Sequence, residues 1–169
     1  MLSFLGNKVY TLKEIKDIVK AYLDQYWNNR YPIDPVAIAT AAGISVYGRG
    51  NIESYPYSGR CVWRDDVAYI EYNLEEVLPR QRHVVAHELG HVALMHKNVT
   101  PDMGAFYDGK DILEKQANMF ADELLVPGDV LIRILRNGTT SDARELSVIF
   151  GVSVKLMEAR IAAVGNEVA

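Results

Sequence analysis

The spacing of apolar residues predicts two helices in the first quarter of the chain. Between Thr11 and Asn28 apolar residues recur every three or four positions, and Thr11 with Glu14 forms the capping-box pattern that marks a first helical turn. Pro35 suits the first position of a second helix, and Gly43 suits its end. We therefore expect one long helix that covers a core with one face, followed by a short one.

Strand-like patterns follow in residues 44–47, 61–63 and 67–72. Residues 64–66 form a short, turn-like connection between the last two runs, which is typical of a hairpin. We expect a small antiparallel sheet of three strands. An exposed edge of that sheet would offer backbone donors and acceptors with which an extended substrate peptide can pair.

The next segment, residues 81–97, reads QRHVVAHELGHVALMHK and is apolar on nearly every side, as in a buried helix. Within it, His87, Glu88 and His91 form an HExxH signature. Residues four apart on a helix lie on the same face, so one ion can contact both imidazoles. Glu88 is rotated by about 100° from His87, where its carboxylate can reach a water molecule without being a ligand. This arrangement is typical of a hydrolytic zinc site.

The alternative is a core helix whose histidines bond to backbone carbonyls. A metal ion explains the pattern better, because it satisfies two imidazoles and a carboxylate that are costly to bury unpaired. Two further histidines compete for the ligand role. His83 lies four residues before His87, but no glutamate stands between them, and His96 lies five residues after His91 and points to another face. We interpret both as structural or facing solvent.

An open zinc site needs a third protein ligand, and a helix predicted from about Lys110 to Val126 can provide it. A polar loop, residues 98–110, precedes that helix and has the composition of a mobile flap. The acidic candidates in the loop and helix are Asp108, Asp111, Glu114, Asp122 and Glu123.

Helical phase separates these candidates. Glu114 lies beside the apolar arc of the helix, whereas Glu123 falls about 180° away and is expected to face water. Small residues at Gly90 and Ala117 would let the two helices approach closely, and Asn118, one turn after Glu114, would hold a ligand in place. Glu114 is therefore the predicted third ligand. The alternative role for Glu114 is a favourable charge at a helix N-terminus.

Residues 141–161 contain a helix, a turn at Gly151 and a second helix capped by Ser153, which together resemble a helix-turn-helix. The second helix offers only Lys155 and Arg160 to phosphate, opposed by Glu158. This charge balance favours packing or repressor docking over direct DNA binding.

Composition excludes several classes of protein. The chain has 169 residues, of which 49% are hydrophobic, and this suits a folded globular protein. A net charge of −4 argues against a general nucleic-acid or membrane-surface binder. Cys61 is the single cysteine, so no internal disulfide forms and a reducing compartment is indicated. Without a basic leader or an apolar run of eighteen residues, we expect a cytoplasmic protein without membrane association.

Three motifs, HVVAHELGHVALMH, EKQANMFADELLVP and ELSVIFGVSVKLMEARI, together resemble the ImmA/IrrE family of zinc metallopeptidases. The weaker stretch DPVAIATAAGISVYG also fits, so the resemblance covers residues 35–161. It implies an α+β, mainly helical, zincin-like domain at residues 1–126, with the C-terminal helical segment 127–169 packed on it as one compact unit. The family resemblance also implies one Zn²⁺ per chain.

By the same resemblance His87, His91 and Glu114 are the metal ligands and Glu88 is the catalytic residue. The implied partner is a helix-turn-helix repressor of the Xre type, cleaved to relieve repression. Tyr107, in the polar loop, is a candidate for stabilising the oxyanion. Two alternatives are a metal-containing transcriptional regulator and a repressor-binding protein without proteolytic activity.

Overall fold

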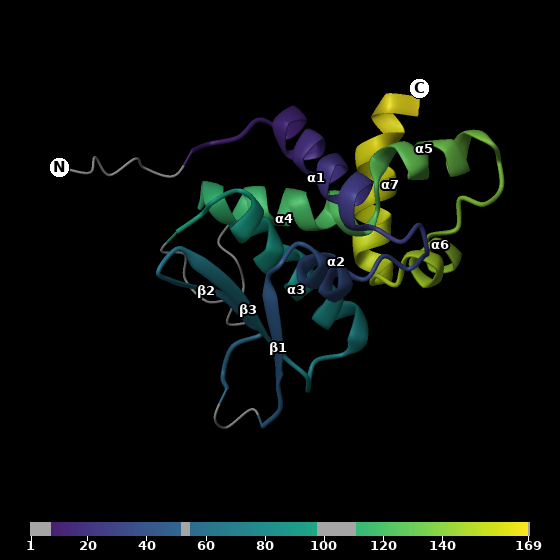
Figure 1. Ribbon diagram of the computed structural model, residues 1–169. Coiled ribbons are helices and arrows are strands. Elements are labelled where there is room, and N and C mark those ends of the chain that lie inside the picture. Colours follow the sequence, from purple (N-terminus) through teal and green to yellow (C-terminus); the bar gives the residue numbers. More distant parts are fainter. Residues whose placement is uncertain (1–7, 52–54, 98–110, 169) are drawn as a thin grey trace.

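The fold is mainly helical, with one small sheet. The computed structural model describes residues 8–51, 55–97 and 111–168, and within them it contains seven α-helices and three strands (Figure 1). The predicted α+β class is therefore confirmed. Tyr107, Asp108 and the rest of the predicted flap lie outside the described residues.

The first two helices form where the sequence predicts them. Helix α1 spans Leu12–Tyr26, and both bonds of its capping box are present: Glu14 N donates to Thr11 Oγ1 over 3.2 Å, and Thr11 N donates to Glu14 Oε2 over 2.8 Å. Helix α2 spans Pro35–Ala41 and is capped by Asp34. Each cap satisfies backbone N–H groups that the first helical turn would otherwise leave without partners.

The sheet has the predicted number of strands but not the predicted directions. Strands β1 (Ser45–Arg49), β2 (Gly59–Arg64) and β3 (Val67–Asn73) lie in the order β1-β3-β2. The β2–β3 hairpin is antiparallel, whereas β1 runs parallel to β3. The prediction of a fully antiparallel sheet is therefore wrong for β1. Residues 50–66, which include β2, separate β1 from β3, and this length lets the chain return before β3 begins.

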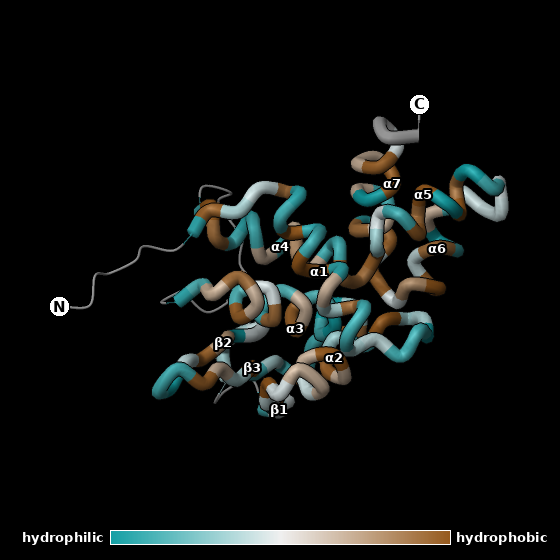
Figure 2. The backbone as a smooth tube through the Cα atoms, turned by 45° about the horizontal axis from the view of Figure 1, so that its top comes forward, coloured by the Kyte–Doolittle hydropathy of each residue, from teal (hydrophilic) through white to brown (hydrophobic). Residues whose placement is uncertain are grey.

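Helix α3 (Leu78–Ala93) lies at the centre of the molecule, between the sheet and helix α4 (Ile112–Leu125). Helix α1 packs on α4, so the layers run α1, α4, α3 and sheet. Figure 2 shows α3 between α4 and the strands. Every residue from Val84 to Val92 is buried, which confirms the prediction of a buried helix. The candidate ligands therefore lie in the interior, between two helices that hold their backbones fixed.

Three further helices form the C-terminal segment, at one side of the molecule (Figure 1). They are α5 (Gly128–Arg136), which the sequence pattern did not predict, α6 (Ala143–Phe150) and α7 (Val154–Val168). Gly151 turns the chain between α6 and α7 with a φ of 63°, as a left-handed C-cap. Arg82 of α3 donates to the carbonyl of Gly151 over 3.0 Å. None of the helices in the described part of the chain has the length and apolar character needed to cross a membrane.

Candidate metal centre

Close packing of α3 against α4 creates the candidate site. A Cβ atom added to Gly90 would lie 3.1 Å from both the carbonyl oxygen of Ala117 and the Cβ of Phe120. Any side chain at position 90 would therefore push the helices apart. The prediction that small residues allow this close approach is confirmed, and the approach explains why α3 accepts a glycine that weakens it by about 1 kcal/mol.

Three predicted site residues meet between these helices. The Nε2 atom of His87 lies 3.0 Å from Glu114 Oε2 and 3.1 Å from the Nε2 atom of His91. His91 Nε2 lies 3.3 Å from Glu114 Oε1. All three side chains are buried, and one donor atom from each lies within 4.8 Å of the other two. Helical phase therefore placed these residues correctly relative to one another.

The chemistry of this cluster fits a divalent cation. Two imidazole nitrogens and a carboxylate converge, and this is a ligand set that zinc accepts. Glu114 Oε1 is buried without a hydrogen-bond partner, although it lies close to His91. A buried carboxylate without a cationic partner is costly, so an ion held by all three groups would supply what the described side chains do not.

The protonation states of these groups also suit metal binding. Burial alone would raise the pKa of Glu114, but the nearby imidazoles of His87 and His91 lower it to about 2. Burial lowers the pKa of His91, and it lowers the pKa of His96 to about 4. At neutral pH the carboxylate is therefore ionised and the imidazole of His91 is neutral, which are the forms that bind metal ions.

Both imidazoles have a partner on the side away from Glu114. His87 Nδ1 lies 2.9 Å from Asn118 Oδ1, the contact expected if Asn118 holds a ligand in place. His91 Nδ1 lies 3.1 Å from the Nδ1 atom of His96. Sequence reasoning missed this second contact because α3 ends at Ala93, before His96, so helical phase does not apply to it.

Glu88 lies on the side of α3 that faces strand β2. It is 2% exposed, and a Cβ added to Gly59 of β2 would lie 3.4 Å from the Glu88 Cγ atom and would overlap Val84. The glycine therefore allows β2 to lie directly against Glu88. Cys61, also on β2, is not an active nucleophile, because burial together with the nearby Glu88 charge raises the pKa of its thiol to about 12.

The remaining acidic and histidine candidates have other roles. Asp111 caps α4 by accepting from the backbone N–H of Leu113, and His83 lies 3.4 Å from Asp122. Glu123 does not face water as predicted, since it is 8% exposed and accepts a bond of 2.7 Å from Arg160 of α7. The side chain of Arg160 thus reaches α4 from another helix, and the periodicity of α4 alone does not reveal this.

Comparison with models of protein families identifies the family of this chain. The family model Peptidase_M78, described as the IrrE N-terminal-like domain, matches residues 39–162. This range includes both helices of the candidate centre and most of the C-terminal segment. No curated protein matches the chain.

Proposed function

Because the chain belongs to the Peptidase_M78 family of IrrE N-terminal-like domains, we propose that it is a zinc-dependent endopeptidase that cleaves a helix-turn-helix repressor. Membership confirms the resemblance noted in the sequence and assigns a metal-dependent, peptidase-type activity to the chain. The observation that carries the proposal is the convergence of His87, His91 and Glu114 in the interior, with Glu88 buried beside them.

In the proposed enzyme, His87, His91 and Glu114 hold the ion. Zinc supplies Lewis acidity, which polarises a peptide carbonyl and makes a water molecule more acidic. Glu88 is the general base that takes the proton from the attacking water, and it then gives that proton to the leaving amine. Glu88 follows His87 directly in the chain, is buried like the ligands, and is not a member of the ligand cluster.

The sheet edge supports a peptide substrate. Strand β2 pairs with β3 on one side, and no other strand among the described residues pairs with its second side. An extended peptide that hydrogen-bonds to this edge would lie next to Gly59 and therefore close to Glu88. This arrangement favours an unfolded or extended segment of the substrate as the cleaved part.

The charges of the C-terminal segment argue against direct DNA binding. Arg160, one of the two cations of α7 that would face phosphate, donates to Glu123 and to the carbonyl of Val126, with 12% of its side chain exposed. It is therefore already engaged within the protein. Lys155 remains exposed on α7, and one cation is a weak basis for binding DNA.

The proposal is tested by replacing Glu88 with Gln, which preserves shape and removes the base. We expect the rate of repressor cleavage to fall by about 10²- to 10⁴-fold, while zinc binding, measured by metal analysis of the purified protein, stays at one ion per chain. Asp17→Asn, an exposed change on α1, is the matched control and should cleave at the normal rate. The substrate in this assay is a purified helix-turn-helix repressor of the Xre type.

The same experiment distinguishes the two alternatives. If Glu88→Gln relieves repression as well as the unchanged protein does, the protein acts by sequestering the repressor and is not a peptidase. If the protein alone shifts DNA in a gel with strong salt dependence, it is a transcriptional regulator. Either result would overturn the proposed peptidase function.

A further inference from the structure

His96 is a buried histidine next to the metal centre but outside its three-residue ligand cluster. Helix α3 ends at Ala93, and Met95 then adopts a left-handed conformation with a φ of 56°. This turn brings the chain back under the helix, where the backbone N–H of His96 donates to the carbonyl of His91 over 2.8 Å. The side chain of His96 is 0% exposed.

The two Nδ1 atoms of His91 and His96 are 3.1 Å apart, so a single proton lies between them. The other ring nitrogen of His91, Nε2, faces His87 and Glu114 and needs a free lone pair to bind an ion. In a neutral imidazole the proton must then be on His91 Nδ1. It follows that His96 Nδ1 is the acceptor and that the proton of His96 is on its Nε2 atom.

We propose that His96 is a positioning residue that accepts the His91 Nδ1 proton and so holds His91 in the tautomer and orientation that bind the metal. This inference rests on the proposed metal centre. The other histidine ligand has a similar contact, because the amide oxygen Oδ1 of Asn118 lies 2.9 Å from His87 Nδ1. Both ligand imidazoles therefore have an acceptor behind Nδ1, one from an amide and one from an imidazole.

Gln116 of α4 explains why His96 adopts the accepting tautomer. The Gln116 amide nitrogen donates to the carbonyl of Tyr10 over 2.6 Å, which leaves its oxygen Oε1 as an acceptor. Gln116 also interacts with the side chain of His96. Oε1 of Gln116 and Nε2 of His96 are both buried, and neither has another hydrogen-bond partner among the described residues. An acceptor oxygen on Gln116 is chemically compatible with an N–H at Nε2 of His96.

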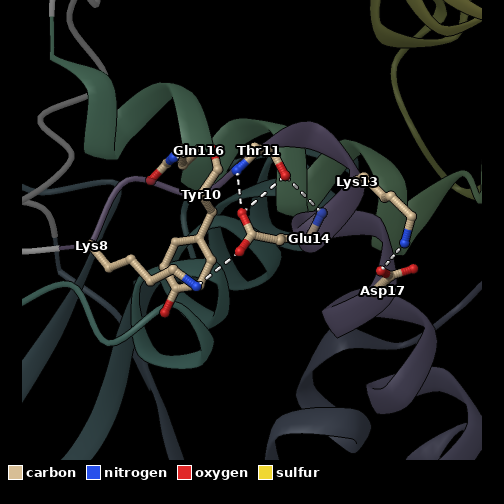
Figure 3. A network of polar contacts seen from close by, with 7 residues as sticks. All are labelled: Lys8, Tyr10, Thr11, Lys13, Glu14, Asp17 and Gln116. Carbon is tan, nitrogen blue, oxygen red and sulfur yellow. Dashed lines mark hydrogen bonds and ion pairs between the residues drawn. The ribbon is translucent and has the colours of Figure 1, made fainter.

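The hydrogen bond from Gln116 to Tyr10 also connects the surroundings of His96 to the segment that precedes α1. Figure 3 shows Gln116 beside Tyr10 and Thr11, where the capping box of α1 begins. The ring of Tyr10 lies 6.5 Å from the ring of His96, measured between centroids. His96 is thus held by α4 and by the start of α1, which gives it the fixed position that a positioning residue needs.

The test uses two variants of similar shape. His96→Asn keeps an acceptor oxygen near the place of Nδ1, and His96→Leu removes it. We expect His96→Leu to weaken Zn²⁺ binding by about 10- to 100-fold, measured by competition with a chromophoric chelator, and His96→Asn to restore most of that loss. Ser147→Ala, at a buried polar residue of α6 that is not among the ligands, is the control and should leave the affinity unchanged.

A second measurement needs no substitution. The chain has four histidines, so ¹⁵N NMR of the imidazole rings can assign each tautomer in the zinc-loaded protein. We expect the proton on Nδ1 of His91 and on Nε2 of His96. This result remains decisive if a variant does not fold.

Two outcomes would overturn the inference alone: a proton on Nδ1 of His96, or equal Zn²⁺ affinities for His96→Leu and the unchanged protein. A residue with only a structural role would lower the stability of the metal-free protein, measured with urea, without changing the metal affinity. If the unchanged protein binds no zinc, the proposed function fails together with the inference. If it binds zinc and cleaves the repressor, the function stands whatever His96 does.

Discussion

Helix α4 carries two glutamates that are equally buried and have opposite surroundings. Glu114 and Glu123 are each 8% exposed, and they lie on opposite faces of the helix. Fixed groups satisfy Glu123, because Arg160 donates to its Oε2 atom over 2.7 Å and the backbone N–H of Gly128 donates to Oε1 over 2.9 Å. Glu114 faces two imidazoles instead, and its Oε1 atom has no hydrogen bond.

The difference shows that burial alone does not identify a functional carboxylate. Glu123 has a permanent cation, since the guanidinium of Arg160 is charged at any physiological pH, and this pair joins α4 to α7. The pKa of His91 is lowered by burial, so that imidazole is not a permanent cation at neutral pH. Glu114 therefore faces imidazoles, whose charge depends on pH, where Glu123 faces a guanidinium, and a cluster of this kind can bind an ion.

The largest expected effect comes from Glu114→Gln. Loss of the charged ligand should weaken Zn²⁺ binding by more than about 100-fold, beyond the effect of losing an outer partner, and repressor cleavage should fall below detection. The measurement is chelator competition together with the rise in melting temperature on adding zinc. A ligand at one hundred times its Kd stabilises the folded state by about 2.7 kcal/mol, and this increment should disappear.

Glu123→Gln is the matched control for Glu114→Gln, because the same chemical change is made at the same burial on the same helix. It should retain the zinc affinity and the stabilisation by zinc. If both variants lose zinc equally, the effect comes from damage to α4 and the distinction between its two faces is wrong.

The next effect in size concerns folding stability. Glu123→Ala leaves Arg160 buried without its partner, so the free energy of unfolding should fall by about 3 kcal/mol. Urea unfolding with a chelator present measures this loss without a contribution from metal. The double variant Glu123→Ala with Arg160→Met should recover part of it, because no charge is then left unpaired. Equal stability of the single and double variants would show that the pair does not couple α4 to α7.

The same two glutamates show what the sequence can predict. Helical phase placed Glu114 correctly relative to His87 and His91, because all three lie inside regular helices and their neighbours on α3 and α4 face each other directly. The same reasoning failed for Glu123, since it assumed that one face of α4 is covered. Which further helix covers the second face depends on tertiary packing, and the periodicity of one helix does not contain that information.

The other errors have a similar origin. His96 follows the end of α3, where a left-handed residue at Met95 reverses the chain, and the sequence has no glycine there to mark the turn. The direction of β1 depends on a long connection rather than on a local turn, whereas the β2–β3 hairpin was predicted correctly from its short one. Local sequence patterns thus predicted local structure, whereas the pairing of segments far apart in the sequence depends on tertiary packing.

The smallest expected effect on stability is at Glu71 of β3. This buried carboxylate is also paired with cations, but its two arginines lie near the surface. Glu71 is 3% exposed and accepts from Arg49 over 2.9 Å and from Arg60 over 2.5 Å, although both arginines remain partly exposed. Burial alone would raise the pKa of Glu71, but these hydrogen bonds lower it below the ordinary value of 4.5. The ionised carboxylate therefore stabilises the fold above about pH 4.5, and the contribution is lost as the pH falls through the lowered pKa.

We expect Glu71→Gln to reduce the free energy of unfolding by about 1–2 kcal/mol at pH 7, a modest loss because solvent screens the partly exposed arginines. Urea unfolding at a series of pH values should show the difference from the unchanged protein shrinking below about pH 4.5, because the protonated Glu71 then resembles glutamine. Zinc affinity should not change, since Glu71 is outside the ligand cluster. A difference that stays constant down to pH 3 would mean that the charge of Glu71 does not stabilise the fold. The ion pairs of Glu71, whose arginines are partly exposed, would then stabilise the fold less than the pair of Glu123, whose arginine is 12% exposed.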